Sequence, residues 1–393
     1  MNAAARFDCY LEHLSEGLGH ADRHAGLRGY CTGLMLPLSR KSVEPMAARM
    51  DPMHASARHQ SLHHFVAKAE WSDTQMLRRV SQWVVPKLDL GQGGWWIIDD
   101  TGLPKKGRHS VGVTRQYCGM LGKQDNCQVA VSISLASNQG SLPVAWQLYL
   151  PGEGAADPER RAKAGVPEEV RPCVVPRRTA TLQPMRVKAL AMSLPPQAFQ
   201  TITWREGTNT SLRERFAALR VRHAGGNVGK ARLRPEQWLL IEWPAHEAEP
   251  SKYFLSTLPE DASIQELVSV AHQRWRIERD YQDLKQDFGL GHYEGRGWRG
   301  FHHHAALSIA AYGFLMAERL VADKSVGGKK NFIERQVPVL PEDYIPRGSP
   351  ASAAPRNELD HVAAPSAGLP ADCSPRTVPM LRKSKRKATL VTQ

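Results

Sequence analysis

Two adjacent carboxylates, Asp99 and Asp100, follow the apolar segment Trp95–Ile98. A short, fully apolar run of this kind predicts a buried strand. A strand end holds carboxylates rigidly, as a Mg2+ site requires. Adjacent Asp residues also commonly cap a turn. The pair therefore indicates either a metal site or a capped turn.

A second group of chemically active residues lies on a helix predicted over 263–288. Arg274, Glu278, Tyr281 and Lys285 are spaced i, i+4, i+7 and i+11. This spacing places them on one helix face, which forms either a solvated row of ion pairs or one wall of a site. The basic, glycine-rich segment 291–300 follows as a turn in which backbone and guanidinium groups can approach a phosphate.

The elements that position these residues follow from apolar spacing. Residues 1–88 have a helical pattern, and Ser42 followed by Pro45 marks one helix start. The remaining elements are strands at 95–98, 127–135 and 142–150, a hairpin turn at Ser137–Gly140, and a long helix over 302–320. A second β-rich block comprises 201–204, 216–222, 238–243 and 253–258, whereas 151–195 has little strand or helix pattern.

Composition restricts the class of protein. Lys and Arg number 52 and Asp and Glu 39, so the net charge of +13 favours a polyanionic partner such as nucleic acid. The longest nearly apolar run, Ala305–Ala317, is shorter than the roughly 18–20 residues of a membrane helix. The N-terminus lacks a signal-peptide pattern, and the six cysteines form no regular framework. We therefore expect a reduced, cytoplasmic protein that does not enter a membrane.

Several long segments, in this order, resemble DDE-type bacterial insertion-sequence transposases. The resemblance covers roughly residues 7–320 and lies mainly in segments 96–107, 109–119, 122–128, 142–151, 274–285 and 289–296. It implies an α+β fold: a helical module, then an RNase H-like mixed sheet with a β-rich insertion. The domains expected are a helical DNA-binding module (1–90), the first part of the catalytic core (91–199), the insertion (200–260), the Glu helix with a packing helix (261–322) and a disordered proline-rich basic tail (323–393).

The resemblance also implies a two-metal phosphoryl transfer, in which carboxylates hold two Mg2+ ions about 3.5–4 Å apart. Mn2+ is expected to substitute for Mg2+. Asp100 matches the first carboxylate because it precedes Thr101, with Asp99 as the fallback, and Glu278 matches the third. The metal ligands expected are Asp100 and Glu278. Contacts to DNA are expected from Arg274, Lys285, Tyr281, Arg296, Lys105 and Lys106.

Two departures from the family pattern bear on activity. The Tyr of its Tyr-x2-Arg-x3-Glu-x6-Lys helix is replaced by Ala271. The strand that carries the second catalytic Asp is missing, as if an internal block had been lost between the Leu142–Pro151 segment and the insertion. Asp125 and Asp157 are the remaining Asp residues nearby, but neither ends an apolar strand. We therefore expect an incomplete catalytic triad.

Other residues have two interpretations each. His302–His304 are consecutive, so they point in different directions on a helix and indicate core packing rather than zinc. Trp204, Trp238 and Trp243 suit core packing better than stacking on an unpaired base. The arginines along 213–222 suit either DNA contact or a solvated strand face.

The expected function is therefore Mg2+-dependent cleavage and joining of DNA at the terminal inverted repeats of an insertion sequence and at target DNA, by a homodimer in a synaptic complex. An impaired active site is expected. The alternatives are an inactive DNA-binding remnant, a metal-dependent nuclease that cuts without joining, and a chain that does not fold because an apolar strand edge is left unpaired.

Overall fold

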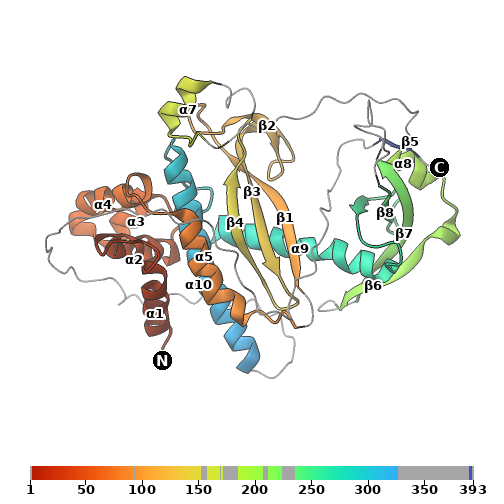
Figure 1. Cartoon of the computed structure of the whole chain (residues 1–393), viewed down its shortest axis with the longest axis horizontal. Coiled ribbons are helices and arrows are strands. Elements are labelled where there is room, and N and C mark those ends of the chain that lie inside the picture. The colour runs from red at the N-terminus through yellow and green to blue at the C-terminus, as the bar shows by residue number, and fades with distance from the viewer. Residues whose placement is uncertain are drawn as a thin grey trace.

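The computed structural model describes residues 2–91, 94–151, 157–168, 170, 185–206, 211–223, 235–325 and 389–391. Within these residues, helices dominate the N-terminal part, and two antiparallel sheets follow, connected by one long helix (Figure 1). The α+β class expected from the sequence is therefore confirmed.

The N-terminal part is helical as predicted. Ser42 occupies the N-cap of its helix with extended backbone, and Pro45 lies in the first turn. The apolar faces meet in a core that includes Phe7, Tyr10 and Tyr30, each 0–1% exposed. The helices are α1 (Ala3–Ser15), α2 (Asp22–Met35), α3 (Val43–Met50), α4 (Ala55–Ala67) and α5 (Asp73–Val84), with short 3-10 turns at Pro52–His54 and Val85–Lys87.

The first sheet contains β1 (Trp95–Pro104), β2 (Thr114–Cys118), β3 (Lys123–Ala136) and β4 (Ser141–Leu148). All its pairs are antiparallel, and β3 pairs with each of the other three strands. Within the described residues β1 pairs only with β3, so its other edge is open. The hairpin turn predicted at Ser137–Gly140 connects β3 to β4, while the short strand β2 was not predicted.

Two long helices cover one face of this sheet. Helix α9 (Ile264–Gln286) begins at a capping box formed by Ser263 and Glu266 and crosses behind the strands in Figure 1. Helix α10 (Trp298–Ser325) packs against β4, where Phe301 stacks on Trp146. We call this covered side the inner face of the sheet and the opposite side its outer face.

Helix α10 is long and apolar enough to span a membrane by length and composition alone. In this structure, however, 78% of its apolar window is buried inside the molecule. It contacts α2, α4, α5, α9 and β4, and its residues join those of the N-terminal helices and the sheet in one hydrophobic core. The helix is therefore the central core helix of the fold.

The second sheet confirms the β-rich block. Its strands are β5 (Met185–Arg186), β6 (Gln200–Glu206), β7 (Ser211–His223), β8 (Gln237–Glu242), β9 (Lys252–Ser256) and β10 (Thr389–Val391). The first half of α9 packs on it through Leu267, Val268 and Ala271. Ala271, which replaces the tyrosine of the family pattern, is 3% exposed within this contact.

The expectation that 151–195 lacks regular structure is wrong for two segments. Helix α7 (Pro158–Ala164) has Asp157 as N-cap, Pro158 at its first position and left-handed Gly165 at its end. Helix α8 (Val187–Met192) buries Val187, Leu190 and Ala191 against the second sheet. Both helices are too short for an apolar period to show. Capping residues marked α7, whereas the N-cap of α8 is Arg186, which makes no side-chain cap bond. Residues 171–184 lie outside the described part of the chain.

The disordered tail predicted over 323–393 lies largely outside the described residues. Its described parts are the last turn of α10, at its start, and β10, which pairs antiparallel with β5 and β7. The predicted tail therefore contributes a short strand to the second sheet.

Candidate active site at strand β1 and helix α9

One face of α9 lies along β1 and makes hydrogen bonds with it through three side chains. The guanidinium of Arg274 donates to Asp99 Oδ1 at 2.7 Å, the Tyr281 hydroxyl donates to the Asp99 carbonyl at 3.0 Å, and Lys285 Nζ donates to the Gly102 carbonyl at 3.1 Å. These three residues are spaced as the sequence predicted, so the helix face expected from their spacing faces β1. The side chains on this helix face hydrogen-bond to the strand and do not form a solvated row of ion pairs.

The two adjacent aspartates lie on opposite faces of β1, because successive side chains of a strand alternate. Asp99 points to the inner face, is 9% exposed and pairs with Arg274. Burial raises the pKa of Asp99, and the Arg274 charge partly opposes this increase. Asp100 points to the outer face and is exposed. The carboxylate accessible to solvent is therefore Asp100, the residue that the sequence favoured as the first ligand.

Glu278 lies on the same face of α9 as the three contact residues. Its side chain is 53% exposed, and its Oε1 is 3.9 Å from Arg274 Nε. Arg274 thus has Asp99 on one side and Glu278 on the other. The β1 carboxylate that Arg274 brings toward Glu278 is therefore that of Asp99, whereas Asp100 points to the opposite, outer face.

The chemistry of these donors suits a hard divalent cation. Mg2+ is held by oxygen ligands and is commonly bound by one or two carboxylates, with water and substrate phosphate completing its shell. Asp100 and Glu278 have this donor chemistry, but Asp100 points away from the face of the sheet that α9 covers. In the described part of the chain no group of three or more His, Cys, Asp or Glu residues gathers as a metal site. The described residues therefore do not form the two-metal site that the resemblance implied.

The two aspartates considered as substitutes for the second carboxylate have local roles. Asp125 lies near the start of β3, where it pairs with Lys123 at 3.0 Å and accepts from the Asn126 backbone. Asp157 caps α7 by accepting from the backbone N–H groups of Glu159 and Arg160. Both positions agree with the prediction that neither ends an apolar strand.

The six residues predicted to contact DNA divide into two sets. Four are engaged inside the protein: Arg274, Tyr281 and Lys285 on β1, and Lys105, whose Nζ donates to the Tyr293 carbonyl at 2.6 Å. Burial lowers the pKa of Lys105 to about 8. Lys106 and Arg296 are exposed. The Arg296 carbonyl accepts from the Val111 backbone, which holds the 291–300 turn against the loop after β1.

The three consecutive histidines point in different directions and are buried, in agreement with core packing. His302 bonds to Trp298 and Leu148, His303 to Val66 and Trp71, and His304 to Tyr30 and Gly289. These bonds tie α10 to the N-terminal helices and to β4.

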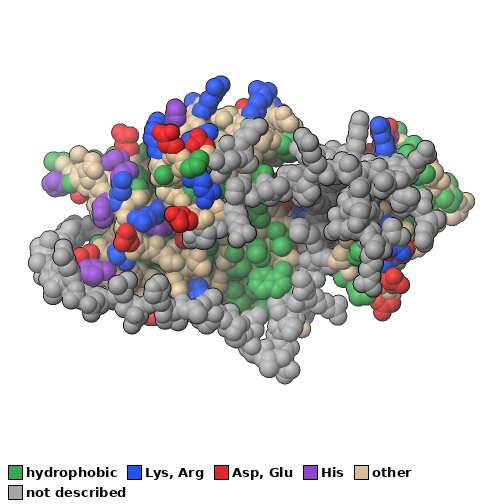
Figure 2. Space-filling view, turned by 45° about the horizontal axis from the view of Figure 1, so that its top comes forward, with side chains coloured by type: hydrophobic (Ala, Val, Ile, Leu, Met, Phe, Trp, Pro, Cys, Tyr) green, Lys and Arg blue, Asp and Glu red, His purple; other side chains and the backbone are tan. Residues whose placement is uncertain are grey.

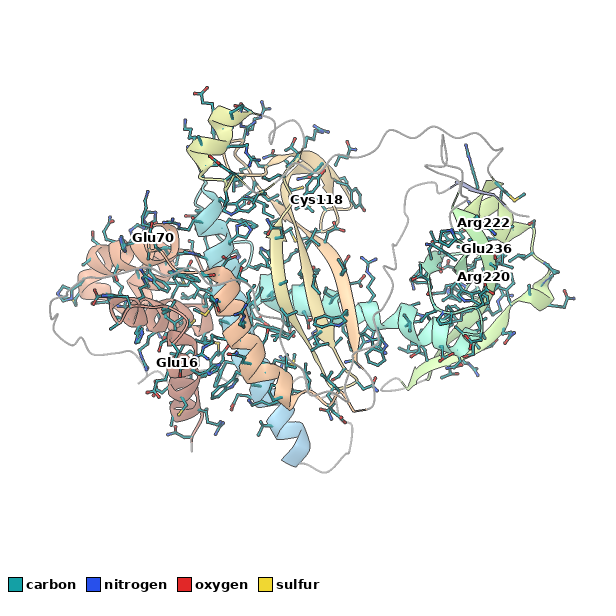
Figure 3. All side chains as sticks on the ribbon, viewed as in Figure 1. Glu16, Glu70, Cys118, Arg220, Arg222 and Glu236 are labelled. Atoms are coloured by element: carbon teal, nitrogen blue, oxygen red, sulfur yellow. The ribbon has the colours of Figure 1, made fainter. Side chains whose placement is uncertain are left out.

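The aromatic and basic residues of the second sheet are also engaged internally. Trp204 stacks on His272 at a ring-centroid distance of 4.1 Å, while the Trp238 and Trp243 ring N–H groups donate to backbone carbonyls. Arg220 and Arg222 both pair with Glu236; the three residues are labelled in Figure 3. This part of the arginine row is therefore neutralised within the sheet.

Sequence reasoning missed a buried polar cluster behind the site. Asp280 Oδ1 accepts from the Ser141 hydroxyl at 2.8 Å and from the Tyr312 hydroxyl at 2.7 Å, which joins α9, β4 and α10. Ser132 bonds to Tyr281 at 2.8 Å on the same inner face. The alternation of Ser132 and Ser134 within the apolar strand β3 was the available signal, since buried hydroxyls require partners.

Comparisons with known proteins agree with this arrangement. Residues 13–180 match the family model described as DDE superfamily endonuclease, and residues 175–314 match the one described as transposase DDE domain. Together the two models cover helices α2 to α5, the first sheet, strands β5 to β9 and α9, and they define the class as DDE endonucleases. The chain belongs to the DDE-type insertion-sequence transposases.

One curated relative is the probable transposase for insertion sequence element IS701 of Microchaete diplosiphon. It is 37% identical to the chain over 94 residues. The aligned part spans 24% of this chain and 24% of that relative. The similarity therefore concerns about a quarter of each protein.

Proposed function

We propose that this protein is a DNA transposase that cleaves the terminal inverted repeats of its insertion sequence and joins them to target DNA. The observation that carries the proposal is the contact of β1, at Asp99, with the face of α9 that carries Arg274 and Glu278. Membership of the family supplies the reaction class, and the net charge of +13 supports a polyanionic substrate.

The chemistry proposed is phosphoryl transfer assisted by a divalent cation, with Mg2+ as the physiological ion and Mn2+ as a substitute. Asp100 and Glu278 would hold the cation at the edge of β1 that no described strand covers. There it would stabilise developing charge on an oxygen of the scissile phosphate. Arg274 acts on the site by holding Asp99 on the inner face, which keeps the geometry of β1. The incomplete set of carboxylates supports an impaired rather than a fully active enzyme.

Plasmid nicking by the full chain in Mg2+ and in Mn2+ tests this proposal. The DNA would carry the ends of the element that encodes the protein. We expect slow nicking that is lost in Asp100→Asn and in Glu278→Gln and is absent with EDTA. Nicking that survives both substitutions would overturn the assignment of the site. Asp125→Asn provides the matched control, because its carboxylate pairs locally with Lys123.

An inactive DNA-binding remnant is the second candidate, and one observation favours it. No group of three metal-ligating side chains gathers in the described residues. A remnant would bind duplex DNA with an affinity that falls steeply with salt but would nick no plasmid in either metal. Nicking without joining of the ends would instead indicate a nuclease. In either case we propose a cytoplasmic protein that pairs DNA ends as a homodimer.

A further inference from the structure

The hairpin formed by β2 and β3 bends back over the outer face of β1. A Cβ atom placed on Gly102 would lie 2.8 Å from Cys118 Sγ and 3.3 Å from Cys118 Cα. Gly102 and Asp100 are two residues apart on one regular strand, so both present the same face. The end of β2 therefore lies on the outer face of β1, one side-chain position beyond Asp100. Figure 3 labels Cys118 at this end of the sheet.

The contact is packed and apolar, which fixes the position of the hairpin. Cys118 and Cys127 are fully buried and cluster with Val129, which faces Gly102 across the β1–β3 pair. Gly102 has no side chain to keep Cys118 away, so any larger residue there would displace the hairpin. The next row along the outer face holds Asp100 beside Val131, which is only partly buried. The hairpin thus covers the outer face at Gly102 and leaves the next outer-face residue of β1, Asp100, accessible.

The tip of this hairpin exposes large apolar side chains. Tyr117 is 42% exposed, Met120 is 56% and Leu121 is 41%. They account for three of the nine large hydrophobic residues that are exposed in the described chain. Gly122, directly after Leu121, completes the turn into β3 with a φ of +66°, a left-handed conformation that glycine adopts without strain. We call Tyr117, Met120 and Leu121 the apolar tip.

Exposed cations flank the apolar tip. Arg115 faces Asn126 across the β2–β3 pair and is exposed. The Asn126 side chain in turn donates to the carbonyls of Lys105 and Gly107, which places the exposed Lys106 beside the base of the hairpin. The nearby carboxylate of Asp125 is paired with Lys123. Arg115 thus lies two residues from Tyr117 on the same strand, and Lys106 lies at the base of the hairpin.

We propose that the apolar tip is a stacking site for unpaired nucleotides of the DNA end whose phosphate lies at Asp100. A phenol ring and two flexible apolar side chains suit the faces of bases, and an arginine suits the adjoining phosphates. Stacking of this kind tolerates any base sequence. The tryptophans of the second sheet are packed within that sheet. Exposed apolar surface beside Asp100 also includes Ile98, which is 43% exposed on the same face of β1, and Figure 2 shows apolar side chains gathered over the first sheet. The apolar tip adds the exposed aromatic ring of Tyr117 to this surface. This inference rests on the proposed function.

Two fluorescent DNA duplexes of the same sequence and length, one fully paired and one with three unpaired nucleotides at its end, test the inference. Binding would be followed by anisotropy in EDTA, so that cleavage does not contribute. We expect the wild-type chain to bind the forked duplex about tenfold more tightly, since each stacked base strengthens binding. Combined substitution Tyr117→Ser, Met120→Ser and Leu121→Ser should reduce this preference to about onefold, with binding to the paired duplex unchanged.

Control variants test whether the effect belongs to the apolar tip. Met53→Ser removes another exposed methionine, 86% exposed in the N-terminal helices, and should leave the preference intact. Tyr117→Phe should retain the preference because the ring remains. If the triple variant unfolds at a lower temperature, Leu121→Asn alone should still reduce the preference severalfold. A 2-aminopurine base at the unpaired position should be quenched by the wild-type chain and not by Tyr117→Ser.

Equal binding of both duplexes by the wild-type chain would overturn the inference but leave the proposed function standing, as would a preference that survives the triple substitution. Loss of self-association in the triple variant, with the forked preference intact, would also overturn it and identify the apolar tip as a contact between two copies. Failure to bind either duplex would overturn the proposed function and the inference together.

Discussion

Asp99 and Asp100 are adjacent in the chain, yet their carboxylates lie on opposite faces of β1. Asp99 is buried and bonded to Arg274 at 2.7 Å, whereas Asp100 is exposed on the outer face. The first is thus placed to hold the strand against α9 and the second to meet a ligand. Substitution of the two residues should separate stability from activity.

Asp99→Ala should lower the free energy of unfolding by about 1–3 kcal/mol, since it leaves Arg274 partly buried without its carboxylate. Asp100→Ala should change it by less than about 0.5 kcal/mol, as for most exposed residues, and should abolish nicking. Urea unfolding and plasmid nicking would measure both effects. Equal destabilisation by the two substitutions would contradict the assignment of faces.

Lys105 and Lys106 form a second pair of neighbours with different roles. Lys106→Ala should weaken DNA binding and reduce the slope of log affinity against log salt by about 1, because an exposed phosphate contact is removed. Lys105→Ala should leave that slope unchanged and lower the melting temperature, since its ammonium binds the Tyr293 carbonyl. Salt-dependent anisotropy and thermal unfolding of both variants test the distinction.

Asp280 should make stability depend on pH. Burial raises its pKa from 3.8 to about 6, although Tyr312 and Ser141 donate to it. The folded state therefore binds the proton more tightly than the unfolded state, so this group's contribution is complete below pH about 4 and is lost as pH rises through about 6. The difference corresponds to roughly 3 kcal/mol. Asp280→Asn should flatten the urea midpoint between pH 4 and 7, and an unchanged slope would refute the coupling.

Gly313 lies where α10 packs closely against α1 and α5. A Cβ atom there would lie 2.7 Å from Val80 Cγ1 and 3.1 Å from the Tyr10 hydroxyl oxygen. Gly313→Ala should therefore destabilise the protein by about 1–3 kcal/mol through overpacking. Gly107→Ala is the control, since nothing lies within 4 Å of its Cβ position. Unaltered thermal stability of Gly313→Ala would contradict this prediction and show that α5 can shift to accommodate the added methyl group.

Much of the fold could be predicted because its signals are periodic. The apolar spacing in α9 predicted its bounds to within two residues. The alternation at 216–222 predicted the strand type of β7, which begins earlier, at Ser211. The short strand β2 and the helices α7 and α8 could not be predicted in this way, because five to seven residues do not establish a period. Capping residues such as Asp157 and Gly165 were the remaining signal there.

The candidate site could be predicted only in part. Helical spacing placed Arg274, Tyr281 and Lys285 on one face, which the contacts with β1 confirm. The same spacing could not tell whether that face meets DNA or the protein itself, because this depends on which strand lies opposite. The bend of the β2–β3 hairpin over Gly102 also depends on tertiary packing, and no local pattern in the sequence indicates it.

Helices α1 and α2, at the start of the chain, pack against α10, the last of the described helices. Tyr10 donates to the Ala310 carbonyl at 2.8 Å and Tyr30 bonds to His304 at 2.9 Å, across 300 and 274 residues of chain. At about 5–20 residues per second of synthesis, the first helices would wait roughly 15–60 s for their partner. A ribosome that stops before α10 would release a chain with its largest apolar surface uncovered. Such fragments should be removed by proteolysis, so that complete translation becomes a condition for stable accumulation.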